Sequence, residues 1–341
     1  MIELTNSPED IARAAEILKN GGLSAFPTET VYGLGADAFN TQALARVFEV
    51  KGRPRFDPLI IHIASLETLE KTTSLDGLEP RNKESLEKLI SSFWPGPLTF
   101  VLPKHPSLPG LATAGLSTAA IRFTSNPIAR ELITLSTGAV AAPSANLFGK
   151  LSPTRAEHVI ETLGNKIDCV IDGGPCKIGV ESTVLELVPV PRILRPGGIS
   201  REQLEAVIGP VAEATGSRDE PVHSPGMLPS HYAPKTPLFF HNPEEMDSLP
   251  YRRKEGYLFF SGKNRDIWYN RANDKQITGN ILVLSETGNT TEAASNLYLY
   301  LHELDKSGLT CIHTEMLPET GLGTAVNDRL RRAATSLFAR K

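Results

Sequence analysis

The sequence lacks the features that mark several large protein classes. It has three cysteines in 341 residues, Cys169, Cys176 and Cys311, none in a CxxC pair and none at a spacing from histidine that is typical of zinc sites. This odd and sparse set excludes a disulfide framework and favours a reducing compartment. No apolar run approaches the roughly 20 residues of a membrane-spanning helix, so we expect no membrane anchor, no secretion and a cytoplasmic location.

An excess of charge of one sign is also missing. The chain has 35 Lys and Arg residues against 39 Asp and Glu residues, a formal net charge of −4. This balance excludes a general nucleic-acid coat and leaves room only for a local basic pocket. Hydrophobic residues make up 40% of the sequence, which at this length is enough to give each of two domains its own core.

Apolar, β-rich runs alternate with helical patterns through the first 209 residues, which is typical of an α/β domain. We expect strands at 23–26, 59–63, 98–102, 119–123, 138–142, 169–172 and 183–188, and helices at 8–20, 41–50, 84–91, 126–135, 154–163 and 200–209. Residues 210–236 are rich in Pro, Gly, Ser and His and indicate a linker or covering segment. A smaller α/β pattern follows, with strands near 238–241, 257–261, 281–284 and 310–314 and helices near 291–307 and 324–338.

A basic turn follows the predicted helix at 41–50. Lys51 and Gly52 are what an ordinary helix C-terminus uses to complement the helix dipole and to cap the last turn. Arg53 and Arg55 follow at once, and three cations within five residues repel one another unless an anion neutralises them. Local chemistry therefore leaves a helix cap and an anion site equally open. His62, on the next strand, is also consistent with a plain exposed strand position.

Hydroxyl and amide groups gather at the ends of several predicted elements, in residues 27–35, 113–118, 141–146, 179–183 and 194–198. Each segment alone is more typical of turn chemistry, but their number favours one shared pocket. Gly33, Gly35 and Ala38 match the relaxed dinucleotide fingerprint, yet a polar stretch rather than a continuous strand precedes them. A phosphate-binding P-loop is absent, because no Gly-Lys pair has the required neighbours.

The motifs PTETVYGLG, KGRP with DPLIIHI, FWPGPLTFVL, AAPSAN, GVESTV and ILRPGG, in this order, resemble the YrdC-like domain family over residues 5–210. SHYAPKTPL at 230–238 and GLGTAVNDRLRRAA at 321–334 resemble the linker and tail of its long, two-domain threonylcarbamoyl-adenylate synthases. The resemblance implies a twisted α/β sheet of mixed parallel and antiparallel strands lining a positive cavity, followed by a smaller Rossmann-like α/β domain. The implied domains are 1–209 and 237–341, joined by a linker or lid at 210–236.

The resemblance also implies an activity. ATP, bicarbonate and L-threonine would become L-threonylcarbamoyl-AMP and pyrophosphate, and a separate transferase complex would use the product to modify the adenosine beside the anticodon of certain tRNAs. Direct tRNA binding would not be required. Mg²⁺ would enter mainly bound to ATP, because the sequence shows no dedicated carboxylate cluster. No Ser-His-Asp set or activated cysteine is evident, so catalysis would rest on positioning and charge stabilisation.

Carried over residue by residue, the resemblance assigns side chains to both substrates. The expected threonine-binding groups are Thr30, His62, Arg122, the backbone at Ala142, and Ser182. The expected ATP-binding groups are Lys51, Arg53, Asp57, Thr118, Ser144, Ser152, Arg195 and the linker residue Tyr232. Lys51 and Arg53 would stabilise charge during catalysis, and Asp57 stands where many relatives have Asn.

Two alternatives stay open. One is a carbamoyltransferase of the hydrogenase-maturation type, whose acylphosphatase-like and zinc-finger modules are missing here. The other is a non-catalytic RNA-binding module, against which stand the missing broad basic surface and the missing interleaved aromatic platform.

Overall fold

The structure, a computed structural model, describes residues 1–214, 232–272 and 279–335. The chain forms two compact units, one of Met1–Phe148 with Ser152–Leu228 and one of Gly149–Leu151 with Pro229–Lys341. Residues 215–231, which make up most of the expected lid, lie outside the described residues.

The first unit is built on an 11-stranded sheet in the order β1-β8-β2-β3-β7-β4-β6-β5-β9-β10-β11. The strands are β1 (Ile2–Leu4), β2 (Ser24–Phe26), β3 (Gly33–Asp37), β4 (Ile60–Ile63), β5 (Leu98–Pro103), β6 (Thr118–Phe123), β7 (Ala139–Ala141), β8 (Cys169–Ile171), β9 (Thr183–Glu186), β10 (Arg192–Arg195) and β11 (Ala212–Glu213). Strand β4 runs parallel to β6 and antiparallel to β7, so the expectation of a mixed sheet is confirmed.

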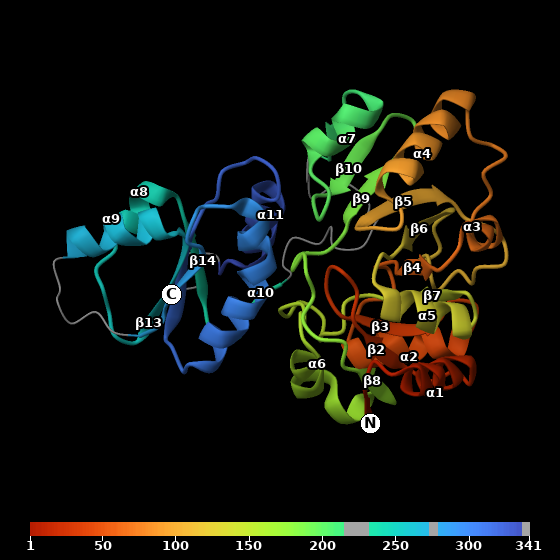
Figure 1. Ribbon diagram of the computed structural model, residues 1–341, viewed down its shortest axis with the longest axis horizontal. Coiled ribbons are helices and arrows are strands. Elements are labelled where there is room, and N and C mark those ends of the chain that lie inside the picture. The colour runs from red at the N-terminus through yellow and green to blue at the C-terminus, as the bar shows by residue number, and fades with distance from the viewer. Residues whose placement is uncertain (215–231, 273–278, 336–341) are drawn as a thin grey trace. The chain divides into compact units, whose positions relative to one another are not determined.

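The helices of this unit begin and end at ordinary signals. They are α1 (Pro8–Lys19), α2 (Thr41–Lys51), α3 (Leu66–Thr72), α4 (Pro80–Phe93), α5 (Pro127–Leu135), α6 (Ala156–Leu163) and α7 (Arg201–Ile208), with a 3-10 turn η1 (Gly164–Lys166). Ser7 and Asn126 cap α1 and α5 by accepting backbone N–H groups, and Ser200 forms a capping box with Gln203. Figure 1 shows α1 and α5 against the β2, β3 and β7 end of the sheet.

The two faces of the large sheet are covered differently. One face carries Ile61, Ile121 and Phe100, which belong to the main core together with apolar residues of α2, α4 and α6. The opposite face is apolar only towards its ends. At one end α1 and α5 pack on Phe26 and Val140, and towards β9 and β10 a small group of Val101, Val184 and Leu194 forms. Between these two apolar groups, this face carries polar side chains.

Most expected elements appear within a few residues of their predicted bounds, but β3 is a correction. The turn chemistry expected for residues 27–35 is wrong for Gly33 and Gly35, which lie in a strand that pairs antiparallel with β2. A Cβ atom on Gly35 would lie 2.6 Å from the Phe26 ring and 2.8 Å from a Val140 methyl group. Glycine is therefore needed here for close packing within a strand rather than for flexibility. The short β1, β10, β11 and α3 also went unpredicted.

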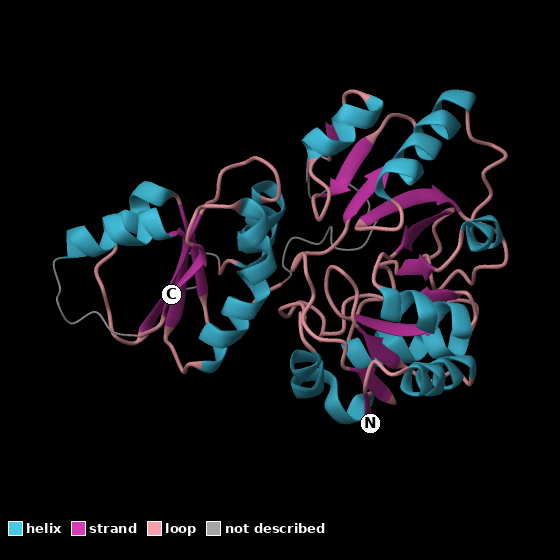
Figure 2. Ribbon diagram, in the orientation of Figure 1, coloured by secondary structure: helices cyan, strands magenta, loops and turns pink. Residues whose placement is uncertain are grey.

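The second unit has a four-stranded parallel sheet in the order β12-β15-β13-β14. Its strands are β12 (Leu238–His241), β13 (Glu255–Ser261), β14 (Ile281–Ser285) and β15 (Cys311–Glu315), and its helices are α8 (Pro243–Asp247), α9 (Gly262–Ala272), α10 (Thr290–Lys306) and α11 (Gly323–Ala333). Helices α8 and α9 cover one face of this sheet, and α10 and α11 cover the other (Figure 2). This layering matches the expected Rossmann-like domain, although the sequence patterns predicted neither α8 nor α9.

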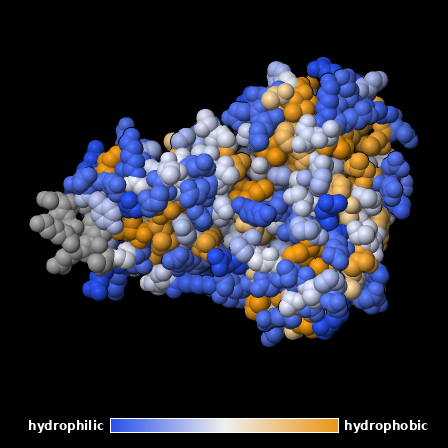
Figure 3. All heavy atoms as spheres, in the orientation of Figure 1, coloured by the Kyte–Doolittle hydropathy of each residue, from blue (hydrophilic) through white to orange (hydrophobic). Residues whose placement is uncertain are grey.

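The exposed surface offers no membrane-spanning element among the described helices, none of which combines the length and apolar character that a crossing needs. Exposed large hydrophobic side chains such as Phe56, Leu135 and Val190 lie far apart in the sequence. In the face shown in Figure 3, hydrophobic spots are separated by hydrophilic residues.

Candidate active site in the first unit

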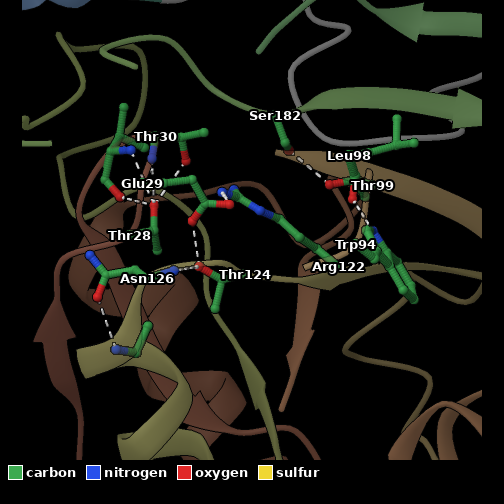
Figure 4. Close-up of polar contacts among 12 residues, drawn as sticks. Thr28, Glu29, Thr30, Trp94, Leu98, Thr99, Arg122, Thr124, Asn126 and Ser182 are labelled. Carbon is green, nitrogen blue, oxygen red and sulfur yellow. Dashed lines mark hydrogen bonds and ion pairs between the residues drawn. The ribbon is translucent and has the colours of Figure 1, made fainter. Parts of the chain in front are cut away.

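A row of polar side chains crosses the middle of the large sheet. His62 on β4 is the register partner of Arg122 on β6, and Arg122 is the partner of Thr99 on β5. Register partners project to the same face, so these three side chains lie side by side on the face between the two apolar groups. The Thr99 hydroxyl is 2.8 Å from that of Ser182, which directly precedes β9 (Figure 4). The sheet thus brings together three of the predicted threonine-binding residues, His62, Arg122 and Ser182.

Arg122 is held by the carboxylate of Glu29, which is not among the predicted site residues. Glu29 Oε1 lies 2.8 Å from Arg122 Nη2, and both side chains are buried. Burial alone would raise the pKa of Glu29, but the charge of Arg122 and the Thr124 hydroxyl, which donates to Glu29 Oε2, hold that pKa below its usual value. In this structure Glu29 is therefore an anion that occupies one edge of the Arg122 guanidinium.

Thr30 follows Glu29 in a tight turn that its neighbour Thr28 organises. The Thr28 hydroxyl donates to the Val31 carbonyl and lies 2.8 Å from the Thr30 hydroxyl. Across the sheet, the Ala142 N–H already donates to the Ile60 carbonyl. If Ala142 contacts a ligand through its backbone, it therefore does so through its carbonyl oxygen.

Buried polar atoms without partners mark this part of the sheet as a binding surface. Both ring nitrogens of His62 and the Nε atom of Arg122 are shielded from water and form no well-formed hydrogen bond with the described residues. Burial and then the nearby Arg122 lower the pKa of His62 to about 3, so the ring is neutral at physiological pH. An orphaned buried donor costs free energy unless a ligand or water completes it. The alternative of a plain exposed strand position for His62 is therefore wrong, because its side chain is buried.

The basic turn at the end of α2 is a helix cap, as one of the two open readings predicted. Gly52 has φ 62°, in the left-handed region, and its N–H bonds back to carbonyls of the last turn. The Arg53 side chain then turns inward, donating from Nε to the Asp57 carbonyl at 3.1 Å and from Nη2 to the Pro58 carbonyl at 2.8 Å. Its Nη2 also lies 2.8 Å from Asp57 Oδ1. Arg53 is thereby fixed in place, whereas Arg55 is exposed.

Lys51 is buried and committed to backbone carbonyls. Its Nζ donates to the carbonyls of Ser144 and Asn146, each at 2.5 Å. Burial, followed by the charge of Arg53, lowers the pKa of Lys51 well below its ordinary value. In this structure Lys51 fastens the loop that carries Ser144 to the end of α2. The assignment of Lys51 and Ser144 to ATP stays a prediction.

Asp57 connects this cationic turn with the polar row. Burial raises its pKa, while the cations Arg53, Lys51 and Arg195 act in the opposite direction. Its Oδ2 atom is buried and has no hydrogen-bond partner among the described residues. Arg195, at the end of β10, donates from Nη2 to the Ser182 carbonyl at 2.9 Å and to the Ser182 hydroxyl at 3.1 Å. Arg195 therefore contacts Ser182 of the predicted threonine set and acts through its charge on Asp57 of the predicted ATP set.

The remaining predicted ATP residues lie at separate places. The Ser152 hydroxyl donates to Glu181 Oε1 at 2.5 Å, and Glu181, like Glu29 and Thr99, was not predicted as a site residue. Thr118 begins β6 on the same face as Arg122, about 13 Å along the strand, and lines a cavity of about 370 Å³ with Val101 and Glu186.

Tyr232 belongs to the second unit. It has φ 65° and its ring lies 4.9 Å beneath the Arg329 guanidinium. The predicted contact of Tyr232 with ATP is not tested by this arrangement.

The described residues of the first unit contain no group of three His, Cys, Asp or Glu side chains placed to hold a metal ion. Neither carboxylate oxygen of Asp57 has a well-formed hydrogen bond with the described residues, although Oδ1 forms an ion pair with Arg53, and the charges of Arg53, Lys51 and Arg195 act on this group. Such surroundings suit a phosphate better than a divalent cation held by protein ligands alone.

Comparison with known proteins gives consistent matches over both units. A family model described as "Telomere recombination" matches residues 16–197, and one described as "Threonylcarbamoyl-AMP synthase, C-terminal domain" matches residues 199–335. A protein of Bacillus subtilis named threonylcarbamoyl-AMP synthase is 42% identical, covering 97% of this chain and 95% of the relative. One of Pyrococcus abyssi with the same name is 43% identical, covering 94% and 93%. The crystal structure of P. abyssi Sua5 complexed with L-threonine is similar with a TM-score of 0.86 and 39% identity, over 98% of both chains.

Proposed function

The chain belongs to the threonylcarbamoyl-AMP synthase family in its long, two-domain form, and we propose that it carries out that synthesis. L-threonine, bicarbonate and ATP become L-threonylcarbamoyl-AMP and pyrophosphate. The observation that supports an active site in the first unit is the buried polar row, in which His62 and Arg122 lie side by side and each has a buried polar atom without a well-formed hydrogen bond. We also propose that the product passes to a tRNA-modifying transferase in the cytoplasm without a need for direct tRNA binding by this chain.

Threonine binding follows from the chemistry of the row. The substrate carboxylate is the natural partner of Arg122, because the buried Nε–H has no well-formed hydrogen bond and a charge-assisted hydrogen bond to a carboxylate is a strong one. Neutral His62 can accept one hydrogen bond and donate another, which suits the hydroxyl of threonine. The hydroxyls of Thr30 and Ser182 and the Ala142 carbonyl complete a polar lining that an apolar amino acid cannot satisfy.

The reaction needs two bond-forming steps. The uncharged threonine amine attacks the bicarbonate carbon and water leaves, which gives a carbamate. A carbamate oxygen then attacks the α-phosphorus of ATP, and the bond from that phosphorus to the bridging oxygen breaks as pyrophosphate departs. Cys176 is not a candidate nucleophile, because burial raises its pKa to about 12 and keeps the thiol protonated.

Charge stabilisation falls to the cationic network. Arg53 and Arg195 are buried and held in place by backbone carbonyls, so little reorganisation is needed as charge builds on the leaving pyrophosphate. Mg²⁺ would arrive with ATP and neutralise its phosphates. Lys51 acts by fastening the loop that carries Ser144 to the end of α2.

The function is tested by incubating the full chain with ATP, Mg²⁺, bicarbonate and L-threonine while measuring pyrophosphate and the adenylate product. Omission of either threonine or bicarbonate is expected to abolish both signals. Pyrophosphate release that ignores either substrate would overturn the proposal. Release that depends on carbamoyl phosphate would indicate the carbamoyltransferase alternative, and salt-sensitive RNA binding without turnover would indicate the binding module.

Arg53 offers a matched pair of variants. Arg53→Ala is expected to lower kcat by roughly 100- to 1000-fold, as loss of a fixed charge-stabilising donor does. The exposed neighbour, changed in Arg55→Ala, is expected to have a far smaller effect. Equal effects of the two changes would show that the turn supplies only diffuse positive charge.

A further inference from the structure

A second group of reactive side chains lies in the second unit, at the beginnings of two neighbouring strands. Glu255 starts β13 and Cys311 starts β15, and the two are register partners in the parallel sheet. His313 follows Cys311 by two residues, so its side chain projects to the same face. A carboxylate, a thiol and an imidazole are therefore gathered on one face of the sheet by backbone pairing alone.

Two of the three separations between donor atoms match a tetrahedral metal site. His313 Nε2 lies 3.2 Å from Glu255 Oε2 and 3.4 Å from Cys311 Sγ, and all three atoms lie within 4.8 Å of one another. Around a tetrahedral zinc ion, usual bond lengths put nitrogen and oxygen ligands about 3.3 Å apart, and nitrogen and sulfur ligands about 3.6 Å apart. Both observed separations agree to within about 0.2 Å.

We propose that Glu255, Cys311 and His313 bind a zinc-like divalent transition-metal ion in the second unit. Thiolate and imidazole ligands select zinc and related ions over Mg²⁺, which prefers oxygen ligands in an octahedral arrangement. The fourth position opens into a cavity of about 200 Å³ whose lining includes Leu249 and Pro250. Water or an exogenous ligand occupies that position.

The imidazole of His313 is already oriented for this role. Its ring is stacked between those of Phe239 and Tyr257, at centroid distances of 5.6 Å and 5.5 Å. Its other nitrogen, Nδ1, lies 3.0 Å from Nε2 of His241. Histidines that bind metals commonly use the second ring nitrogen in such a hydrogen bond, which fixes the tautomer and leaves Nε2 for the metal. His241 is thus a positioning residue.

The same residues can form a hydrogen-bonded network without a metal, with His313 donating from Nε2 to Glu255. Arg252 Nη1 lies 3.3 Å from Glu255 Oε1 and leaves Oε2 facing His313. Metal binding at His313 Nε2 needs the neutral imidazole with its proton on Nδ1, and it removes the proton of the Cys311 thiol. At least that thiol proton is released, so binding tightens as pH rises. A passive network has no such linkage, and this difference makes the proposal testable.

The experiment uses the full chain, stripped of metal with a chelator and free of ATP. Zn²⁺ is titrated by calorimetry in excess Mg²⁺, and Co²⁺ is added separately to look for the thiolate charge-transfer band and the intense visible bands of tetrahedral cobalt. Cys311→Ser and His313→Gln are each expected to abolish the thiolate band and the one-site binding. Cys169→Ala and His105→Gln, matched changes in the first unit, are expected to leave both unchanged. His241→Gln is expected to weaken binding by roughly 10- to 100-fold.

Circular dichroism and thermal unfolding of each variant establish that its second unit is folded. Binding of one zinc per chain that is insensitive to Mg²⁺, lost in both ligand variants and tighter at higher pH supports the site. Folded wild-type protein that gives no cobalt–thiolate band, or zinc binding that survives in the double variant Cys311→Ser/His313→Gln, overturns it. This test does not depend on adenylate synthesis, so it stands or falls separately from the proposed function.

Discussion

Replacing Arg122 by methionine perturbs both the fold and the threonine site, and the two effects can be separated. The change keeps an unbranched side chain but leaves Glu29 buried without its ion-pair partner at 2.8 Å. Removing one member of a buried pair typically costs about 3–5 kcal/mol of unfolding free energy. Glu29 escapes part of this cost by taking up a proton, so we expect a loss near the lower end, about 3 kcal/mol.

The double variant Arg122→Met/Glu29→Gln removes both charges. Its neutral amide still accepts the Thr124 hydroxyl bond that Glu29 accepts now, so we expect most of the lost stability to return. The substrate carboxylate, however, has no guanidinium to meet. A hydrogen bond to a charged group contributes about 1.5–3 kcal/mol, which corresponds to an increase of roughly 10- to 150-fold in the KM for threonine.

The assays are urea unfolding for stability and threonine-dependent pyrophosphate release for binding, with Glu29→Gln as the remaining corner of the cycle. The KM for ATP is expected to change little, because Arg122 belongs to the threonine side of the network. A double variant that is as stable as the wild type and keeps the wild-type KM for threonine would refute the assignment of Arg122.

Three further predictions concern His62, Asp57 and Tyr232. The His62 pKa of about 3 lies below its value in the unfolded chain, so the unfolded chain binds more protons and folding stability falls as pH drops below about 6.5. The loss is about 2 kcal/mol between pH 7 and pH 5. Urea unfolding of His62→Gln at these pH values should not show this loss. Burial raises the pKa of Asp57 in the folded protein, so the folded state binds the proton more tightly than the unfolded chain does. The contribution of the protonated Asp57 to folding stability is therefore lost as pH rises through that pKa. The stability of Asp57→Asn relative to the wild type should therefore increase from acid towards neutral pH, while the KM for ATP changes little. A variant that is more stable than the wild type only in acid would contradict this direction of the pH dependence. Tyr232→Ala should raise the KM for ATP and lower the adenylate yield if the segment 210–236 acts as a lid, and unchanged values in a folded variant would rule the lid out.

The sequence predicts those elements whose apolar periodicity is strong, such as α1, β4, β5 and α10. The sequence does not predict elements in which tertiary packing, rather than local preference, decides which residue is needed. Gly33 and Gly35 are typical of turns in a lone sequence, because the close approach of Val140 to Gly35 comes from β7, a strand distant in the sequence. Short strands such as β10 are bounded by prolines and carry too few residues for an alternation to be visible.

The site residues divide in the same way. Arg122, His62 and Ser182 were found through motifs, but Thr99 becomes visible only when the register of β5 with β6 places it beside Arg122. A lone threonine in an otherwise apolar strand is the only local signal. The cluster of Glu255, Cys311 and His313 is likewise invisible to spacing rules, because its ligands come from two strands that pair across more than fifty residues.

The connection between the two predicted substrate sets is a requirement of the chemistry. A carbamate oxygen must approach the α-phosphorus to about 3–3.5 Å before it can attack, so threonine and ATP have to share a wall. Arg195 provides such a wall, since it contacts both Ser182 oxygens and lies close enough to act on Asp57. Asp57 in turn fixes Arg53 at the end of α2. The basic turn, for which the local sequence left two interpretations open, is therefore a helix cap. Its Arg53 pairs with Asp57, and the charge of Arg195 links Asp57 to Ser182 of the threonine row.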